Sequence, residues 1–223
     1  MRIPSKLIKR VAKTFLLFLS VAVSRLFKMS LILGSRCAFF SGVNCVMPLS
    51  GQFVGSRFGA LLLLIPSLLL AFLNNNYYLT FYHIPSIFAS FYWSVDSKLL
   101  RVGLPLICMA LFIFHPVGQG AWVYSLYWLI PIIMSFIAHK NVFYKALGAT
   151  FSAHAVGSIL WLYGTSIASS VWIALIPVVL VERLAFASGL VLVYKLYSFV
   201  KVHGRAFLTS ICGNVLCTKG LKK

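Results

Sequence analysis

Acidic residues are almost absent from this sequence, because Asp96 and Glu182 are the only two in 223 residues. Catalysis by paired carboxylates and metal binding by several acids need more acidic side chains than this chain has. Charged residues of both signs make up only 10% of the chain, against about a quarter of a soluble domain. A folded chain of this length exposes a large surface. With so few charges, that surface is suited to contact lipid as well as water.

Motifs of catalysis are also missing. The sequence has no GxSxG nucleophile elbow, no HExxH zinc motif and no glycine-rich phosphate loop that ends in Lys-Ser or Lys-Thr. The five cysteines show no metal-ligand spacing and are interpreted as free thiols in a reducing compartment. We therefore expect no enzymatic activity, no catalytic residue, no metal site and no cofactor.

Hydrophobic residues are abundant, at 61% of the chain, and they form long runs separated by short breaks. A helix needs about 20 apolar residues to cross a bilayer. The pattern predicts an all-α, polytopic membrane bundle, in which Pro85 and Pro105 kink or break two helices. The segment 37–51 is predicted to be a loop folded back into the protein. The expected spans are residues 52–73, 77–95, 99–115, 119–138, 143–163 and 169–198.

Basic residues mark the two ends of the chain. Residues 1–36 are predicted to form a basic amphipathic segment that lies on the inner membrane surface, with a mitochondrial presequence as the alternative. Residues 37–200 form the transmembrane helical domain, and residues 201–223 form a basic cytoplasmic tail. The formal net charge of +18 could suggest nucleic-acid binding. We expect none, because the basic residues lie at the chain ends and in the breaks between apolar runs, as they do beside anionic lipid.

The charges in the breaks predict the orientation of the chain. Breaks at residues 74–76, 115–120 and 164–170 carry no Lys or Arg, whereas those containing Lys98 and Arg101, or Lys140 and Lys145, are basic. Basic loops face the cytoplasm. Both termini are therefore expected in the cytoplasm, in a plasma (inner) membrane, with six spans as the prediction and eight as the alternative.

Three glycines recur at every fourth position of SGQFVGSRFGA: Gly51, Gly55 and Gly59. On one face of a helix, such residues allow another helix to approach closely in lipid. One interpretation is packing within this chain. The other is a docking face for a second membrane subunit.

Glu182 and His154 are the candidate functional residues inside the membrane. Both lie more than ten residues from the entrances of their spans, near the bilayer midplane, where ionisable side chains are usually functional. The two spans follow each other and run antiparallel, so we expect His154 and Glu182 to meet. Arg183 points about 100° away from Glu182 on the helix. The pair is either a structural contact between helices or part of a substrate or proton site.

Further candidates for substrate binding lie near the predicted outer surface, namely His115, Gln119 and Trp161. The alternative is that the aromatic residues there form a belt at the membrane interface. That belt would include Tyr124, Tyr127, Trp128, Trp161 and Tyr163.

The layout resembles one known family. Six spans, cytoplasmic termini, small-residue helix faces and the stretch PLSGQFVGSRFGALLLL at residues 48–64 are similar to the S components of energy-coupling factor transporters. Those are membrane subunits that bind vitamins for uptake. The resemblance implies a small-molecule pocket near the outer surface, no ATPase site in this chain, and as partners a transmembrane coupling subunit and two ATPases. Two alternatives remain: a non-transporting assembly or scaffold protein, and a membrane enzyme that uses His154 and Glu182 as an acid–base pair.

Overall fold

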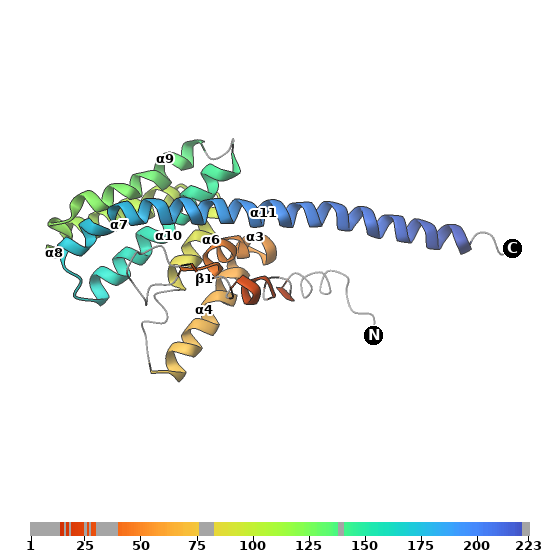
Figure 1. Cartoon of the computed structure of the whole chain (residues 1–223), viewed down its shortest axis with the longest axis horizontal. Coiled ribbons are helices and arrows are strands. Elements are labelled where there is room, and N and C mark those ends of the chain that lie inside the picture. The colour runs from red at the N-terminus through yellow and green to blue at the C-terminus, as the bar shows by residue number, and fades with distance from the viewer. Residues whose placement is uncertain are drawn as a thin grey trace.

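The computed structural model is a helical bundle (Figure 1). It describes residues 14–15, 17, 19–24, 26, 28–29, 40–75, 83–137 and 141–219, with side chains for most of them up to Val200. Of the predicted amphipathic segment, residues 1–36, the first 13 lie outside these ranges, and residues 14–15, 17 and 19–24 are helical. One exception to the helical structure is a two-residue antiparallel pair, in which β1 (Lys28–Met29) pairs with β2 (Phe40–Ser41).

Helix α10 (Val142–Gly164) lies at the centre of the bundle. Its buried residues include Ala146, Gly148, Ala149 and Ala155, which are small and let neighbouring backbones come close. Four helices pack against it: α6 (Ile84–Ser94), α7 (Leu104–Phe114), α9 (Leu129–Ile137) and α11 (Ser169–Lys219).

Helix α11 has 51 residues and is much longer than the bundle it packs against. It runs along the bundle and then projects beyond it toward the C-terminus (Figure 1). The predicted span 169–198 and residues 201–219 of the predicted tail therefore belong to one continuous helix. Within the described ranges, Val142–Gly164 and Ser169–Val200 are the two helices long and apolar enough to cross a membrane.

Other predicted spans are composite. A π-helix, η2 (Leu99–Gly103), leads into α7 where residues 99–115 were expected to span. The short helix α8 (Pro116–Gln119) and a 3-10 helix, η3 (Trp122–Trp128), precede α9 in the region 119–138. Pro85 and Pro105 were expected to kink or break their spans. Pro85 instead lies in the first turn of α6, where proline is tolerated because the first helical N–H groups need no partner within the helix. Pro105 directly follows the π-helical turn η2, so the regular α-helix is interrupted just before it.

The expected first span, residues 52–73, is interrupted. Helix α3 (Ser50–Val54) ends at Gly55, which has a φ of 100°, and α4 (Ser56–Leu73) begins directly after it. The segment before this break is helical and not the predicted loop, with α2 (Val43–Val46) and a 3-10 turn, η1 (Met47–Leu49). It does fold back into the protein: α2 packs on α11, η1 packs on α6, and Leu49 is completely buried.

Two of the uncharged breaks meet at one end of the bundle. Ser169, at the start of α11, donates a hydrogen bond of 2.7 Å to the carbonyl oxygen of Val117 in α8. Near it, the hydroxyl of Tyr163 donates to the carbonyl oxygen of Leu111 at 3.0 Å. Of the basic breaks, Lys145 lies close enough to Arg101 to interact with it electrostatically. These contacts bring together two of the three uncharged breaks, and they place Arg101 and Lys145, from two basic breaks, near each other.

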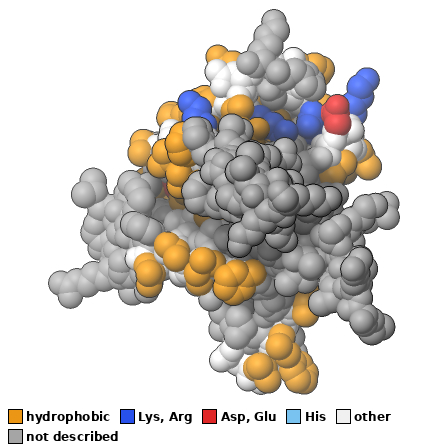
Figure 2. All heavy atoms as spheres, turned by 90° about the vertical axis from the view of Figure 1, so that its right-hand side faces the viewer, with side chains coloured by type: hydrophobic (Ala, Val, Ile, Leu, Met, Phe, Trp, Pro, Cys, Tyr) orange, Lys and Arg blue, Asp and Glu red, His pale blue; other side chains and the backbone are white. Residues whose placement is uncertain are grey.

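Large apolar side chains cover much of the outside of the bundle. Phe72, Phe114 and Phe136 are each more than 70% exposed. Figure 2, which looks at the bundle from the side on which α11 projects, shows hydrophobic side chains spread over this face as well. An apolar surface of this extent is unusual for a soluble monomer and is typical of a protein that contacts lipid or another protein.

Candidate functional site

His154 and Glu182 are both buried, at 9% and 4% exposure, on the packed helices α10 and α11. Each lies roughly 15–20 Å along its helix from the uncharged end of the bundle, by the rise of an α-helix. The structure therefore places both residues at similar depth, well inside the bundle. The partners of the two side chains are nevertheless different, because Glu182 pairs with Arg183 and His154 lies against aromatic rings.

Glu182 pairs with its neighbour in the chain. Its Oε1 accepts a hydrogen bond from Nη2 of Arg183, and the two side chains form a salt bridge. Arg183 was expected on a different face of the helix from Glu182, but its long side chain reaches back to the carboxylate of Glu182. Arg183 also donates from Nη1 to the carbonyl oxygen of Thr150 on α10, at 3.4 Å. A buried carboxylate without a cation is costly, and Arg183 offsets that cost.

His154 lies against aromatic rings. The centroid of its imidazole is 5.3 Å from that of Tyr124 and 6.3 Å from that of Phe151. No hydrogen bond joins His154 to Glu182 among the described residues, and the buried Nε2 of His154 has no partner there. Arg183 lies within electrostatic range of both His154 and Glu182. His154 and Glu182 are therefore not joined by a hydrogen bond, and the guanidinium of Arg183 is the neighbour that they share.

Tyr124 organises the surroundings of His154. Its ring is 2% exposed and contacts the rings of Trp172, His154, Phe112 and Trp128, at centroid distances of 5.0, 5.3, 5.6 and 6.4 Å. Its hydroxyl lies 3.4 Å from Oγ of Ser158. We call these five residues (Phe112, Tyr124, Trp128, His154 and Trp172) the Tyr124 cluster.

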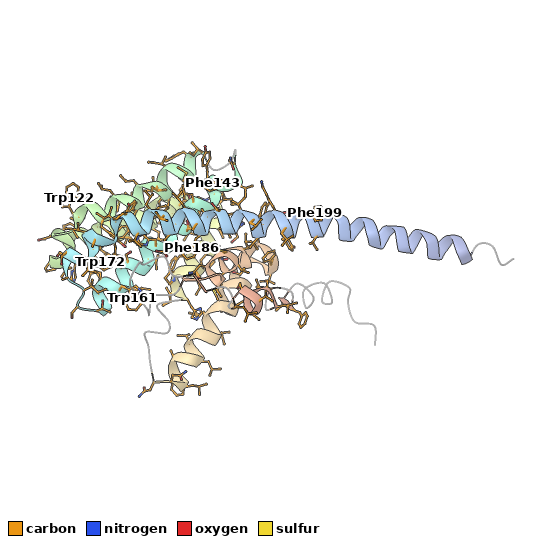
Figure 3. The ribbon with its side chains drawn as sticks, in the orientation of Figure 1. Trp122, Phe143, Trp161, Trp172, Phe186 and Phe199 are labelled. Carbon is orange, nitrogen blue, oxygen red and sulfur yellow. The ribbon has the colours of Figure 1, made fainter. Side chains whose placement is uncertain are left out.

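The assignment of Tyr124 and Trp128 to an interfacial belt is wrong. Trp128 is completely buried, and both side chains pack inside the bundle. Their spacing of four residues did not indicate this burial, because residues four apart in a 3-10 helix lie about 120° apart around the axis. By contrast Trp122 points away from the bundle (Figure 3) and is 52% exposed.

Several buried polar atoms around the Tyr124 cluster lack a partner. Among the described residues these are Nε1 of Trp128, Nε1 of Trp172, Nε2 of His154 and Nε of Arg183. Three of them, the two indole nitrogens and the Arg183 nitrogen, can only donate. Buried polar groups are normally hydrogen-bonded, so this excess of donors is suited to a group that brings acceptor atoms.

Comparison with protein families, with curated proteins and with solved structures finds no match.

His115, Gln119 and Trp161 lie toward the uncharged end, apart from the Glu182–Arg183 pair. His115 caps α8: its Nδ1 accepts a hydrogen bond of 3.2 Å from the backbone of Val117, and its ring packs against Tyr163. Gln119 is exposed, and Trp161 packs on the edge of the core that contains the Tyr124 cluster. The five residues expected to bind substrate are thus divided between two parts of the bundle. Of these five residues, only His154 and Glu182 are deeply buried.

The glycines of SGQFVGSRFGA do not share one continuous helical face. Gly51 is buried where a β-carbon would collide with the hydroxyls of Ser90 and Ser94, and its N–H donates to Oγ of Ser90 at 2.9 Å. Gly59 is buried against the backbone of Ser50 and Gly51. Gly55 is exposed at the break between α3 and α4, with open space in the direction of a β-carbon. Gly51 and Gly59 therefore serve packing within this chain.

In the parts of the chain that the structure describes, His, Cys, Asp and Glu side chains do not gather in groups of three or more that could hold a metal ion. The site consists of four aromatic rings packed against one another, an excess of N–H donors and a charge pair that is neutral overall.

Proposed function

We propose that this chain is an integral membrane protein that binds a small, vitamin-like molecule for uptake. The membrane location is supported by the two long apolar helices and by the exposed apolar side chains of the shorter ones. The binding role is supported by a single observation, the buried donors left unpartnered around Tyr124 in an otherwise apolar bundle.

The topology that we propose has six spans and both termini in the cytoplasm of a cell with a plasma (inner) membrane. It is supported by the contact between two uncharged breaks, through Ser169 and Val117, and by the proximity of two basic ones, through Lys145 and Arg101. Basic loops are retained on the cytoplasmic side during insertion. The end with Lys145 and Arg101 is then the cytoplasmic end.

The partners that we propose follow from the resemblance to S components. Such a subunit has no ATPase site, and it requires a transmembrane coupling subunit and two ATPases to drive uptake. The scaffold alternative was based on glycine docking faces and on the basic tails, and two of the three glycines of SGQFVGSRFGA pack inside the chain. The enzyme alternative depended on proton exchange between His154 and Glu182, whereas Glu182 accepts its hydrogen bond from Arg183. Binding without chemistry fits these contacts better than either alternative.

The experiment is a thermal-shift screen of the purified full-length protein in detergent against vitamins and related metabolites. A ligand at a hundredfold excess over its Kd stabilises the folded state by about 2.7 kcal/mol. The variant Trp172→Phe keeps an aromatic ring, although a smaller one, and loses the buried N–H, so it should reduce the shift. Trp122→Phe is the matched control, because Trp122 is exposed and should leave the shift unchanged. An equal response of both variants, or no shift with any compound, would count against the proposal.

A further inference from the structure

Two cations lie over two neighbouring aromatic rings at the basic end of the bundle. The guanidinium carbon of Arg101, in η2, is 5.6 Å from the ring centroid of Tyr92. Nζ of Lys145, near the start of α10, is 5.0 Å from the ring of Trp93. Tyr92 and Trp93 are buried consecutive residues of α6, so three elements fix the positions of the two cations. Cation–π contacts of this kind hold a basic side chain in place without neutralising its charge.

The acidic charge here is too small to balance the basic charge. Asp96 accepts a hydrogen bond of 2.7 Å from Nη1 of Arg101, but its own side chain is 81% exposed. Glu182 is the other acid of the chain and is already paired with Arg183. Asp96 is therefore the one carboxylate near both Arg101 and Lys145 among the described residues. Lys98, two residues after Asp96 in the sequence, adds a further exposed cation.

Arg101 has hydrogen-bonding capacity for a second anion besides Asp96. Its side chain is only 11% exposed, and its Nε is buried without a partner among the described residues. A guanidinium binds phosphate through two parallel N–H···O bonds, and a lysine ammonium adds a point charge. Arg101 also lies within a π-helical turn, an irregularity that occurs frequently at functional sites.

We propose that Arg101 and Lys145 bind the phosphate group of an anionic phospholipid at the cytoplasmic end of the bundle. Asp96 lies on the exposed side of Arg101 and competes with the phosphate for the guanidinium. The cytoplasmic leaflet is rich in anionic lipid, which accounts for the source of the phosphate. The inference rests on the proposed membrane location, but it is independent of the small-molecule site at Tyr124.

The experiment uses the full-length protein in nanodiscs of phosphatidylcholine that contain increasing fractions of phosphatidylglycerol. Retained lipid is counted by native mass spectrometry, and thermal stability is measured on the same samples. Phosphatidylglycerol should be retained and should stabilise the wild type. Arg101→Gln and Lys145→Gln should each weaken retention about fivefold, as expected for loss of one basic residue at an anionic surface. Lys195→Gln is the control for general attraction to the anionic surface, since Lys195 is an exposed cation on α11 outside the Arg101–Lys145 site, and it should lose less retained lipid than either site variant.

Asp96→Asn gives a test that is independent of folding defects. This variant removes an exposed competitor, so it should bind phosphatidylglycerol more tightly than the wild type does. Inorganic phosphate and glycerol phosphate, added to phosphatidylcholine nanodiscs, distinguish a free anion from a lipid. Stabilisation by these soluble phosphates alone would overturn the assignment to lipid. Equal retention of the two lipids, equal loss in the Lys195 control, or weaker binding by Asp96→Asn would overturn the site. Insertion into nanodiscs reports on the membrane location separately.

Discussion

The phenol of Tyr92 occupies the space that a β-carbon at Gly148 would need, and its hydroxyl donates a hydrogen bond of 2.6 Å to the carbonyl oxygen of Pro131. One side chain of α6 thereby contacts both α9 and α10. Residue 148 has to be glycine for this contact to form, because Tyr92 is 1% exposed and has no room to move.

Gly148→Ala should destabilise the protein by about 2 kcal/mol, because the added methyl displaces the Tyr92 ring and weakens its hydrogen bond to Pro131. The measurement is thermal unfolding of the purified protein in detergent. Gly157→Ala is a suitable control on the same helix, since its β-carbon would meet only Pro85, at 3.3 Å. Equal stability of the two variants would contradict the close contact described for Tyr92.

Removing one member of the Glu182–Arg183 pair should lower the stability of the protein more than removing both. Glu182→Gln leaves a buried guanidinium without its carboxylate, and Arg183→Gln leaves the carboxylate alone. Each should cost about 3–5 kcal/mol, the usual penalty for an unpaired buried charge. The double variant removes both charges and should recover most of that loss in a thermal-unfolding series. Additive losses in the double variant would mean that the two side chains do not interact.

Gly55 and Gly59 should respond to substitution for different reasons. Gly55→Ala meets no atoms but forces a φ of 100° on an L-residue, which costs about 1–3 kcal/mol. Gly59→Ala needs no unusual backbone conformation, but its methyl would lie 2.9 Å from the backbone carbon of Ser50. This clash would push α4 away from α3. Larger residues should therefore worsen the defect at position 59 much more than at position 55. Comparing Ala with Leu at both positions, by thermal stability and yield, tests this. A docking face would instead give variants that fold normally but lose a partner.

Cysteine labelling in whole cells tests the topology. The native cysteines are first replaced by serine, and single cysteines are then introduced at exposed positions. Asn74→Cys and Ala168→Cys should react with a membrane-impermeant maleimide from outside, whereas Lys98→Cys and Lys195→Cys should react only after the cells are opened. Basic segments stay on the cytoplasmic side, which is the reason for the expectation. Labelling of Lys98→Cys from outside would exclude the six-span arrangement.

Much of the architecture could be predicted from local patterns. Apolar runs predicted helices at 143–163 and from residue 169, and the structure has α10 and α11 there. The interruption at Gly55 could not be predicted, because a glycine with a four-residue repeat fits a continuous helix equally well. Its positive φ depends on the packing of α3 against α6, which involves residues about 40 positions away, such as Ser90.

The candidate site was predictable only in part, for a similar reason. Hydropathy identified Glu182 and His154 as unusual, since polar side chains stand out in an apolar run. The role of Arg183 depends on the conformation of a long flexible side chain, which helical periodicity does not describe. Tyr124 and Trp128 lie in a 3-10 helix, where the angle between successive side chains differs from that of an α-helix. Their burial follows from the position of Phe112 and Trp172 on other helices.

The length of α11 has a mechanical consequence. Its 51 residues extend for about 75 Å as an α-helix, more than twice the thickness of a bilayer's hydrocarbon layer. Glu182 and Arg183 lie in the first third of this rod, and about 55 Å of helix separates them from Lys219. A tilt of a few degrees around that pivot displaces the far end by several ångströms. Packing on the bundle continues past this pair, since Ala187 and Leu190 are buried and Tyr197 contacts Phe53, so the helix is a lever whose projecting part begins beyond Tyr197.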